Sequence, residues 1–149
     1  MTLNHTIFTR AQRRRSRSLR RGTAVVELAL TCIILLYLCF GTIEFGYYFF
    51  IKNTLEGAAR EGARAAIPAG ATESSVTSAV DATLTAAGLN TANFTITTTP
   101  TDISTCSVGS NVTVEVSGTW GTVGSGFRPM GLIGTNKTLT GTSVMRKEG

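Results

Sequence analysis

The longest apolar run in the chain is the feature that most restricts its fold. Residues 24–51 read AVVELALTCIILLYLCFGTIEFGYYFFI, and Glu27 and Glu44 are the only charged residues among these 28. A helix of this length measures about 42 Å at ~1.5 Å per residue, which exceeds the ~30 Å hydrocarbon core of a bilayer. The rest of the chain is too short to bury such a helix on all sides. We therefore predict a transmembrane helix over residues 23–51.

Charge lies on one side of this run. Residues 1–22 hold seven arginines and no acid, whereas residues 23–149 hold seven basic and nine acidic side chains, so the net charge of +5 comes from the short tail. Basic residues are retained on the cytoplasmic side of a membrane. The sequence therefore predicts a single-pass membrane protein with a cytoplasmic N-terminus and an exported domain over residues 52–149. Nucleic-acid binding by the tail is an alternative, but the adjacent membrane segment disfavours it.

Other targeting signals fit the N-terminal region less well. A cleaved secretory signal needs small residues after its apolar core, and residues 39–41 (Cys-Phe-Gly) match that pattern poorly. A lipoprotein signal needs a small residue before its cysteine, whereas Leu38 precedes Cys39. The pair Arg20 and Arg21 lacks the apolar and basic residues that usually follow twin arginines. These signals remain as alternatives to an uncleaved membrane helix.

An acidic residue lies just inside the apolar run. Gly22 ends the basic tail, Thr23 follows it, and Glu27 stands five residues after the glycine. An acid within a membrane costs about 2.5–3.5 kcal/mol on insertion scales. The alternative is that Glu27 stays hydrated at the interface. This arrangement resembles the processing site of type IV prepilins, which implies cleavage after Gly22 by a prepilin peptidase and removal of the leader 1–22. Thr23 departs from the aromatic residue that usually starts the mature chain.

Further segments resemble the TadE-like family of the tight adherence (Flp) pilus system. They are residues 44–46, residues 53–66 and, more weakly, residues 127–134 with 139–148. The candidate signature residues are Glu44, Gly46, Glu56, Arg60, Glu61, Gly62 and Arg64. The resemblance implies a minor pseudopilin whose partners are a prepilin peptidase, other pilins or pseudopilins, platform proteins of the inner membrane and the lipid bilayer, without nucleic acid. The resemblance also implies anchoring in the inner (cytoplasmic) membrane and association with a pilus or a related secretion apparatus.

The processing site suggests a physical role for Glu27. Cleavage creates an α-amine on Thr23, and in a bundle of such helices the Glu27 carboxylate of one subunit can meet that amine on a neighbour. The attraction is stronger in a low dielectric than in water. We therefore expect Glu27 to set the register between subunits.

The exported part predicts an α+β fold. The first helix should continue to about Ile67, with Leu55, Ala59, Gly62 and Ala66 on one face that packs either on the chain's own sheet or on another subunit. Ion pairs are expected between Glu56 and Arg60 and between Glu61 and Arg64. A second helix should start at an N-cap Thr72 and stop at Gly88. Strands over residues 94–98, 112–116 and 137–146 should form an antiparallel sheet of three or four strands.

No catalytic, cofactor or metal site is predicted. His5 is the only histidine, and the cysteines Cys32, Cys39 and Cys106 form no metal-binding spacing. The glycine-rich residues 121–126 lack the GK[ST] ending of a phosphate loop, so we predict a flexible turn there. Trp120 and Phe127 are predicted either to fill the core or to form a contact patch. The alternatives to a pseudopilin are an unprocessed single-pass protein with a small exported binding domain and an exported enzyme with an uncleaved anchor.

Overall fold

The computed structural model describes residues 4–124, 126 and 128–148, with side chains from residue 22 onward. The chain divides into two compact units, and the boundary follows Phe40. The long helix α1 (Asn4–Ala66) contributes to both units. The side chains of the tail arginines and of Phe127 lie outside the described residues.

In the N-terminal unit, the apolar part of α1 is exposed on every side. All residues from 22 to 40 are exposed, including Leu38 at 67% and Val26 at 69%. Within the described residues, one helix, Gly22–Ala66, is long and apolar enough to cross a membrane, and 6% of its most apolar stretch is buried. A helix in the core of a soluble protein would be buried instead, so the exposure favours contact with lipid.

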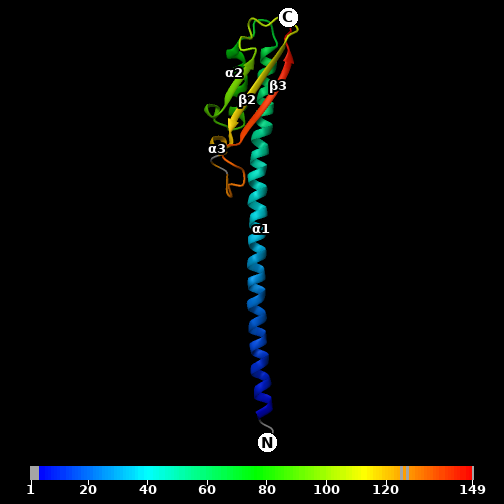
Figure 1. Ribbon diagram of the computed structural model, residues 1–149, viewed down its shortest axis with the longest axis vertical. Coiled ribbons are helices and arrows are strands. Elements are labelled where there is room, and N and C mark those ends of the chain that lie inside the picture. Colours follow the sequence, from blue (N-terminus) through cyan, green and yellow to red (C-terminus); the bar gives the residue numbers. More distant parts are fainter. Residues whose placement is uncertain (1–3, 125, 127, 149) are drawn as a thin grey trace. The chain divides into compact units, whose positions relative to one another are not determined.

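The C-terminal unit has two layers (Figure 1). One layer is a sheet of the strands β1 (Thr95–Thr99), β2 (Asn111–Thr119) and β3 (Thr138–Arg146), in the antiparallel order β1-β2-β3. The other layer contains α1 from Gly41 onward and α2 (Glu73–Ala86). A short 3-10 helix, η1 (Thr91–Asn93), precedes β1, and the four-residue helix α3 (Trp120–Val123) follows β2. The α+β prediction is confirmed, with three strands.

Alternation along β2 decides which face of the sheet is buried. Val112, Val114 and Val116 are fully buried, while Glu115 between them is exposed. Side chains of a strand alternate between the faces of a sheet, so the valines form the inner face and the polar residues face solvent. The register pairs Val114 with Thr98 of β1 and Ser143 of β3.

The face of α1 predicted from the spacing of small residues packs on the chain's own core. Leu55, Ala59 and Ala66 are fully buried, and Gly62 is buried with them. A Cβ on Gly62 would lie 2.7 Å from the Val80 side chain of α2. Of the two interpretations of this face, packing within the chain is therefore correct.

The helix α2 begins and ends as its sequence predicts. The Thr72 hydroxyl accepts a hydrogen bond from the Ser75 N–H, and the Ser75 side chain caps the Thr72 backbone in return. These bonds satisfy backbone donors that the first turn leaves free. Gly88 follows the helix with φ +74°, a conformation that favours glycine.

One element differs from its prediction. Part of the glycine-rich segment, predicted as a flexible turn, forms the helical turn α3, while Trp120 at its start is fully buried and so takes the core role among its two predicted ones. The Trp120 ring lies 5.3 Å from that of Tyr48 and 6.0 Å from that of Tyr47, measured between centroids. Burial of this large ring holds residues 120–123 against α1, which local sequence rules do not anticipate.

Candidate functional site

Glu44 is the only acidic side chain that the described residues bury completely. It projects from α1 and accepts two backbone hydrogen bonds from a distant segment. The Ile133 N–H lies 3.0 Å from one carboxylate oxygen and the Met130 N–H lies 3.3 Å from the other. Gly131, between the two donors, has φ +63°. This left-handed residue turns the chain so that both N–H groups point at one carboxylate.

The two N–H groups compensate for burial of the Glu44 carboxylate. A buried carboxylate without partners costs several kcal/mol, and hydrogen bonds to charged groups contribute about 1.5–3 kcal/mol each. No Lys or Arg among the described residues forms an ion pair with Glu44. We call residues 128–134 the Glu44 loop, because this side chain attaches them to α1.

Glu44 was predicted only as a signature residue at the end of the membrane segment. The spacing of buried residues along α1 does predict that Glu44 is buried. The buried or half-buried positions of α1 continue back from the core at steps of three and four residues: Ala66, Gly62, Ala59, Leu55, Ile51, Tyr48 and Glu44. An acid in phase with this face must find a partner in the folded protein. Its partner lies 86–89 residues away, so the sequence does not show which segment supplies it.

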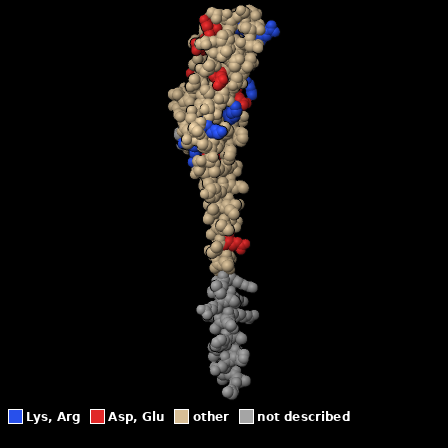
Figure 2. Space-filling model, in the orientation of Figure 1, with Lys and Arg blue, Asp and Glu red and all other residues tan. Residues whose placement is uncertain are grey.

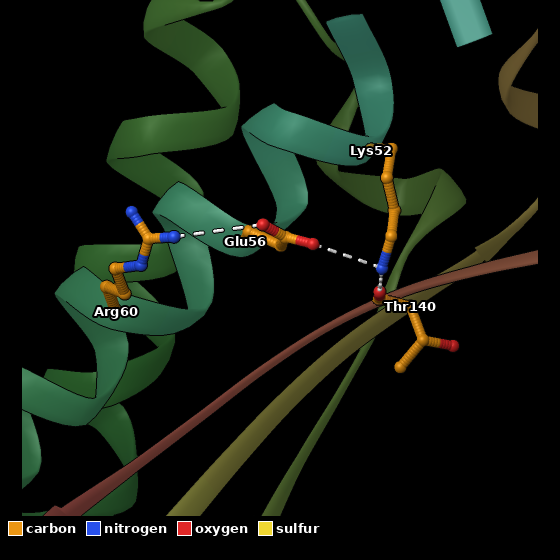
Figure 3. Close-up of polar contacts among 4 residues, drawn as sticks. All are labelled: Lys52, Glu56, Arg60 and Thr140. Atoms are coloured by element: carbon orange, nitrogen blue, oxygen red, sulfur yellow. Dashed lines mark hydrogen bonds and ion pairs between the residues drawn. The ribbon is translucent and has the colours of Figure 1, made fainter. Parts of the chain in front are cut away.

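A polar cluster joins α1 to the last strand (Figure 3). Lys52 lies 3.3 Å from Glu56, and Glu56 lies 3.7 Å from Arg60. The Lys52 ammonium also donates to the Thr140 carbonyl oxygen of β3. The predicted pair of Glu56 and Arg60 is therefore present. Ion pairs this exposed contribute about 0–1 kcal/mol, so the bond to β3 is the more specific feature.

The second predicted ion pair is not formed. No ion pair joins Glu61 and Arg64 in the part of the chain that the structure describes. Both side chains are exposed. Water solvates both charges there, and an ordered pair would lose side-chain entropy for little gain.

The C-terminal segment is fastened to the end of α1. The Lys147 ammonium is buried and donates to the Ala66 carbonyl oxygen at 3.0 Å, and the Glu148 N–H donates to the Ile67 carbonyl oxygen at 3.1 Å. The last carbonyl groups of a helix lack partners within the helix, and a cation there is favourable. The weaker C-terminal block of the resemblance thus contacts α1 at both of its parts.

The aromatic residues at the end of the apolar run divide into two pairs. Tyr47 and Tyr48 are half-buried and contact Trp120. Phe49 and Phe50 are exposed, at 58% and 45%. Aromatic rings at the end of a membrane segment often form an interfacial belt, but only the two phenylalanines are exposed enough for one here. The two tyrosines instead complete the core beside Trp120.

The predicted processing residues lie on an open helix surface. Gly22, Thr23 and Glu27 are all exposed. The Glu27 carboxylate forms no hydrogen bond or ion pair with any described residue, while the Glu27 carbonyl oxygen accepts from the Thr31 hydroxyl at 2.9 Å. Gly46 has open space around its Cα. The structure therefore buries the Glu44 carboxylate against two backbone N–H groups. It leaves the Glu27 carboxylate exposed, where a neighbouring chain could reach it.

Comparisons with known proteins identify part of the chain. No curated protein and no solved structure matches it. Residues 22–64 match the family model described as TadE-like protein. This range begins at the predicted processing glycine and ends in the last turn of α1, so it contains Glu27, Glu44 and the α1 residues of the polar cluster. The TadE-like family is a family of pilus components and is not known for enzymes. The segment 22–64 is TadE-like.

Proposed function

We propose that the protein is a membrane-anchored minor pseudopilin that assists assembly of a tight adherence pilus or a related secretion apparatus. The observation that carries the proposal is the exposed apolar run after Gly22 and Thr23, in which the Glu27 carboxylate has no ion pair with any described residue. Such a surface is unfavourable in water and, at Glu27, also in lipid. A bundle of like helices would satisfy both the apolar surface and the acid.

The arrangement of charge supports the direction of insertion. Seven arginines precede the apolar run within residues 1–22, which favours a cytoplasmic position for this end by the positive-inside rule. The unit that starts at Gly41 would then fold on the exported side of the inner membrane. A prepilin peptidase acts on the cytoplasmic side, where it would meet Gly22.

Cleavage would change the electrostatics of the helix end. The new amine on Thr23 and the carboxylate of Glu27 are four residues apart on one helix, about 6 Å along its axis. In a staggered bundle, the amine of one chain would approach the carboxylate of the next in a medium of low dielectric. This pairing would fix the axial register of subunits.

The first test is intact mass and N-terminal sequencing of the membrane-extracted protein, from cells with and without their prepilin peptidase. We expect a mature chain that begins at Thr23 only when the peptidase is present. Gly22→Ala should block cleavage. Gly46→Ala is the matched control, since both glycines lie in α1 and neither has an atom within 4 Å of an added Cβ. A chain that keeps residues 1–22 in both strains would instead support an unprocessed anchor with an exported binding domain.

The second test addresses Glu27 directly. Glu27→Ala should leave the exported unit folded but lower incorporation into the pilus machinery at least tenfold, measured by co-purification with the assembled complex. Glu61→Ala, the same change at an exposed position of the same helix, should incorporate as the parent does. Equal incorporation of Glu27→Ala and the parent would refute the register role.

A further inference from the structure

The Glu44 loop presents an apolar side chain beside the apolar run of α1. Leu132, in the middle of the loop, is 51% exposed. Its Cδ1 atom would lie 3.3 Å from a Cβ placed on Gly41, so it sits against the helix at that level. Ile43 and Phe45, close by on α1, are 41% and 47% exposed. Apolar surface of the loop therefore adjoins apolar surface of the helix.

The thickness of the hydrocarbon core places Gly41 and Leu132 near the outer edge of the membrane. About 20 residues of helix cross a hydrocarbon core of ~30 Å at ~1.5 Å per residue. Counted from Thr23, the first residue after the basic tail and Gly22, the twentieth residue is Thr42. The boundary between hydrocarbon and headgroups then falls beside Gly41 and Leu132. A tilted helix would draw this level further into the membrane.

The hydrogen bonds to Glu44 order the loop before it contacts the membrane boundary. Two hydrogen bonds hold Met130 and Ile133 on either side of Leu132. The loop is therefore ordered before it meets any partner, which lowers the entropy lost on binding. The same bonds satisfy the Glu44 carboxylate, so the acid does not oppose entry of its surroundings into the membrane boundary.

The charge around the loop is positive. Residues 116–137 contain Arg128 and Lys137 and no Asp or Glu, and Lys137 is three residues from Gly134 at the end of the loop. On the face shown in Figure 2, Lys and Arg gather at the end of the compact unit where α3 and the following loop lie in Figure 1, and most of the Asp and Glu lie further away. Apolar groups beside basic groups favour the surface of a bilayer that contains anionic lipid.

We propose that the Glu44 loop is a second membrane contact of this protein. Leu132 inserts at the outer boundary of the bilayer that α1 crosses, and Arg128 lies among anionic phospholipid headgroups. The occupant of this surface is therefore lipid. The contact would limit rotation of the exported unit relative to the membrane plane. This inference rests on the proposed membrane anchoring.

The test measures the depth of single sites in the full-length protein, reconstituted in vesicles of equal parts phosphatidylcholine and phosphatidylglycerol. The cysteines Cys32, Cys39 and Cys106 are replaced by alanine, and one new cysteine carries a nitroxide label. Accessibility to oxygen, relative to a water-soluble nickel chelate, reports contact with lipid. Three positions are compared: Leu132→Cys, Ile34→Cys within the apolar helix, and Val144→Cys on β3.

Val144 is a matched control, because it is an aliphatic residue that is 55% exposed, close to the 51% of Leu132. We expect the ratio of oxygen accessibility to nickel-chelate accessibility at position 132 to exceed the ratio at position 144 several-fold. It should approach the ratio at position 34. A high ratio at 34 with equal ratios at 132 and 144 would overturn the loop contact and leave the anchoring intact. A low ratio at 34 would overturn the anchoring and the loop contact together. Protection of position 132 from both reagents would show a protein neighbour instead of lipid.

A second measurement tests the headgroup contact. Vesicles of phosphatidylcholine alone should place the label at 132 at a shallower depth than the anionic mixture. Arg128→Gln should remove this dependence on composition, whereas Arg60→Gln, on an exposed part of α1, should retain it. Depth that does not change with lipid charge in the parent would overturn the assignment of Arg128. Trp120 fluorescence confirms that each variant is folded, since this only tryptophan is buried.

Discussion

Replacement of Glu44 by alanine should cost the C-terminal unit a large part of its stability. The substitution removes the acceptor of the Met130 and Ile133 N–H groups, at 3.3 and 3.0 Å. Each hydrogen bond to a charged group contributes about 1.5–3 kcal/mol. One bond is long and the loop lies at the surface, where water can reach the freed N–H groups, so the lower end of this range applies. The expected loss is about 3 kcal/mol.

The size of this loss can be measured from denaturant unfolding of the full-length protein in detergent. Trp120 fluorescence is the reporter, because the chain has one tryptophan and it lies 5.3 Å from the Tyr48 ring on the same helix as Glu44. Glu44→Gln keeps one acceptor oxygen and turns an amide N–H₂ toward the second donor. We therefore expect it to lose about 1.5 kcal/mol, between the parent and the alanine variant.

The control is Glu61→Ala, which makes the same change on the same helix at an exposed position without an ion pair to any described residue. Such a surface substitution should stay within about 0.5 kcal/mol of the parent. A Glu44→Ala variant that unfolds within 1 kcal/mol of Glu61→Ala would refute the reasoning. The carboxylate would then not be what holds the loop on α1.

Two further predictions concern the C-terminal unit. Gly141→Ala should destabilise it by about 3 kcal/mol in the same unfolding assay, because an added Cβ would overlap the Leu55 carbonyl group of α1 and that backbone cannot move aside. The Ser104 hydroxyl and N–H donate to Asp102 and hold the pKa of its carboxyl below the ordinary value of 3.8. Its contribution to stability is therefore complete above that value and disappears as pH falls through the lowered pKa, which carbon NMR of the carboxyl group can follow.

Each of these predictions has a contrary outcome. Gly46→Ala adds a methyl group in open space on α1 and should be neutral or slightly stabilising, so equal effects at 46 and 141 would contradict the packing argument. Ser104→Ala should raise the pKa of Asp102 toward 3.8, because the hydroxyl is the main cause of the shift. An unchanged titration of Asp102 in that variant would show that another group lowers its pKa.

Elements with local signals could be predicted from the sequence. The alternation of Val112, Val114 and Val116 fixes both the strand and its buried face. The Thr72 cap and Gly88 mark the ends of α2 because capping depends on neighbours only a few residues away. The sequence leaves the inner face of β3 ambiguous, since Gly141 has no side chain to show the pattern. Its small size is required by the approach of α1, which is a tertiary constraint.

Contacts between distant segments could not be predicted. The short helix α3 exists because Trp120 packs against Tyr47 and Tyr48, and nothing in residues 120–123 favours a helix alone. The role of Glu44 depends on a loop 86–89 residues away. In both cases a side chain on α1 selects the conformation of a segment that has weak preferences of its own.

Glu27 and Glu44 lie on the same helix but in different environments. Both stand at the edges of the same apolar run, with sixteen uncharged residues between them. Glu44 is buried, and backbone N–H groups of its own chain satisfy it. Glu27 is exposed and finds no partner among the described residues. Because an acid at a membrane edge is costly without a partner, folding alone removes the cost at Glu44. At Glu27 the same cost would favour association with a second chain, as the proposed pseudopilin role requires.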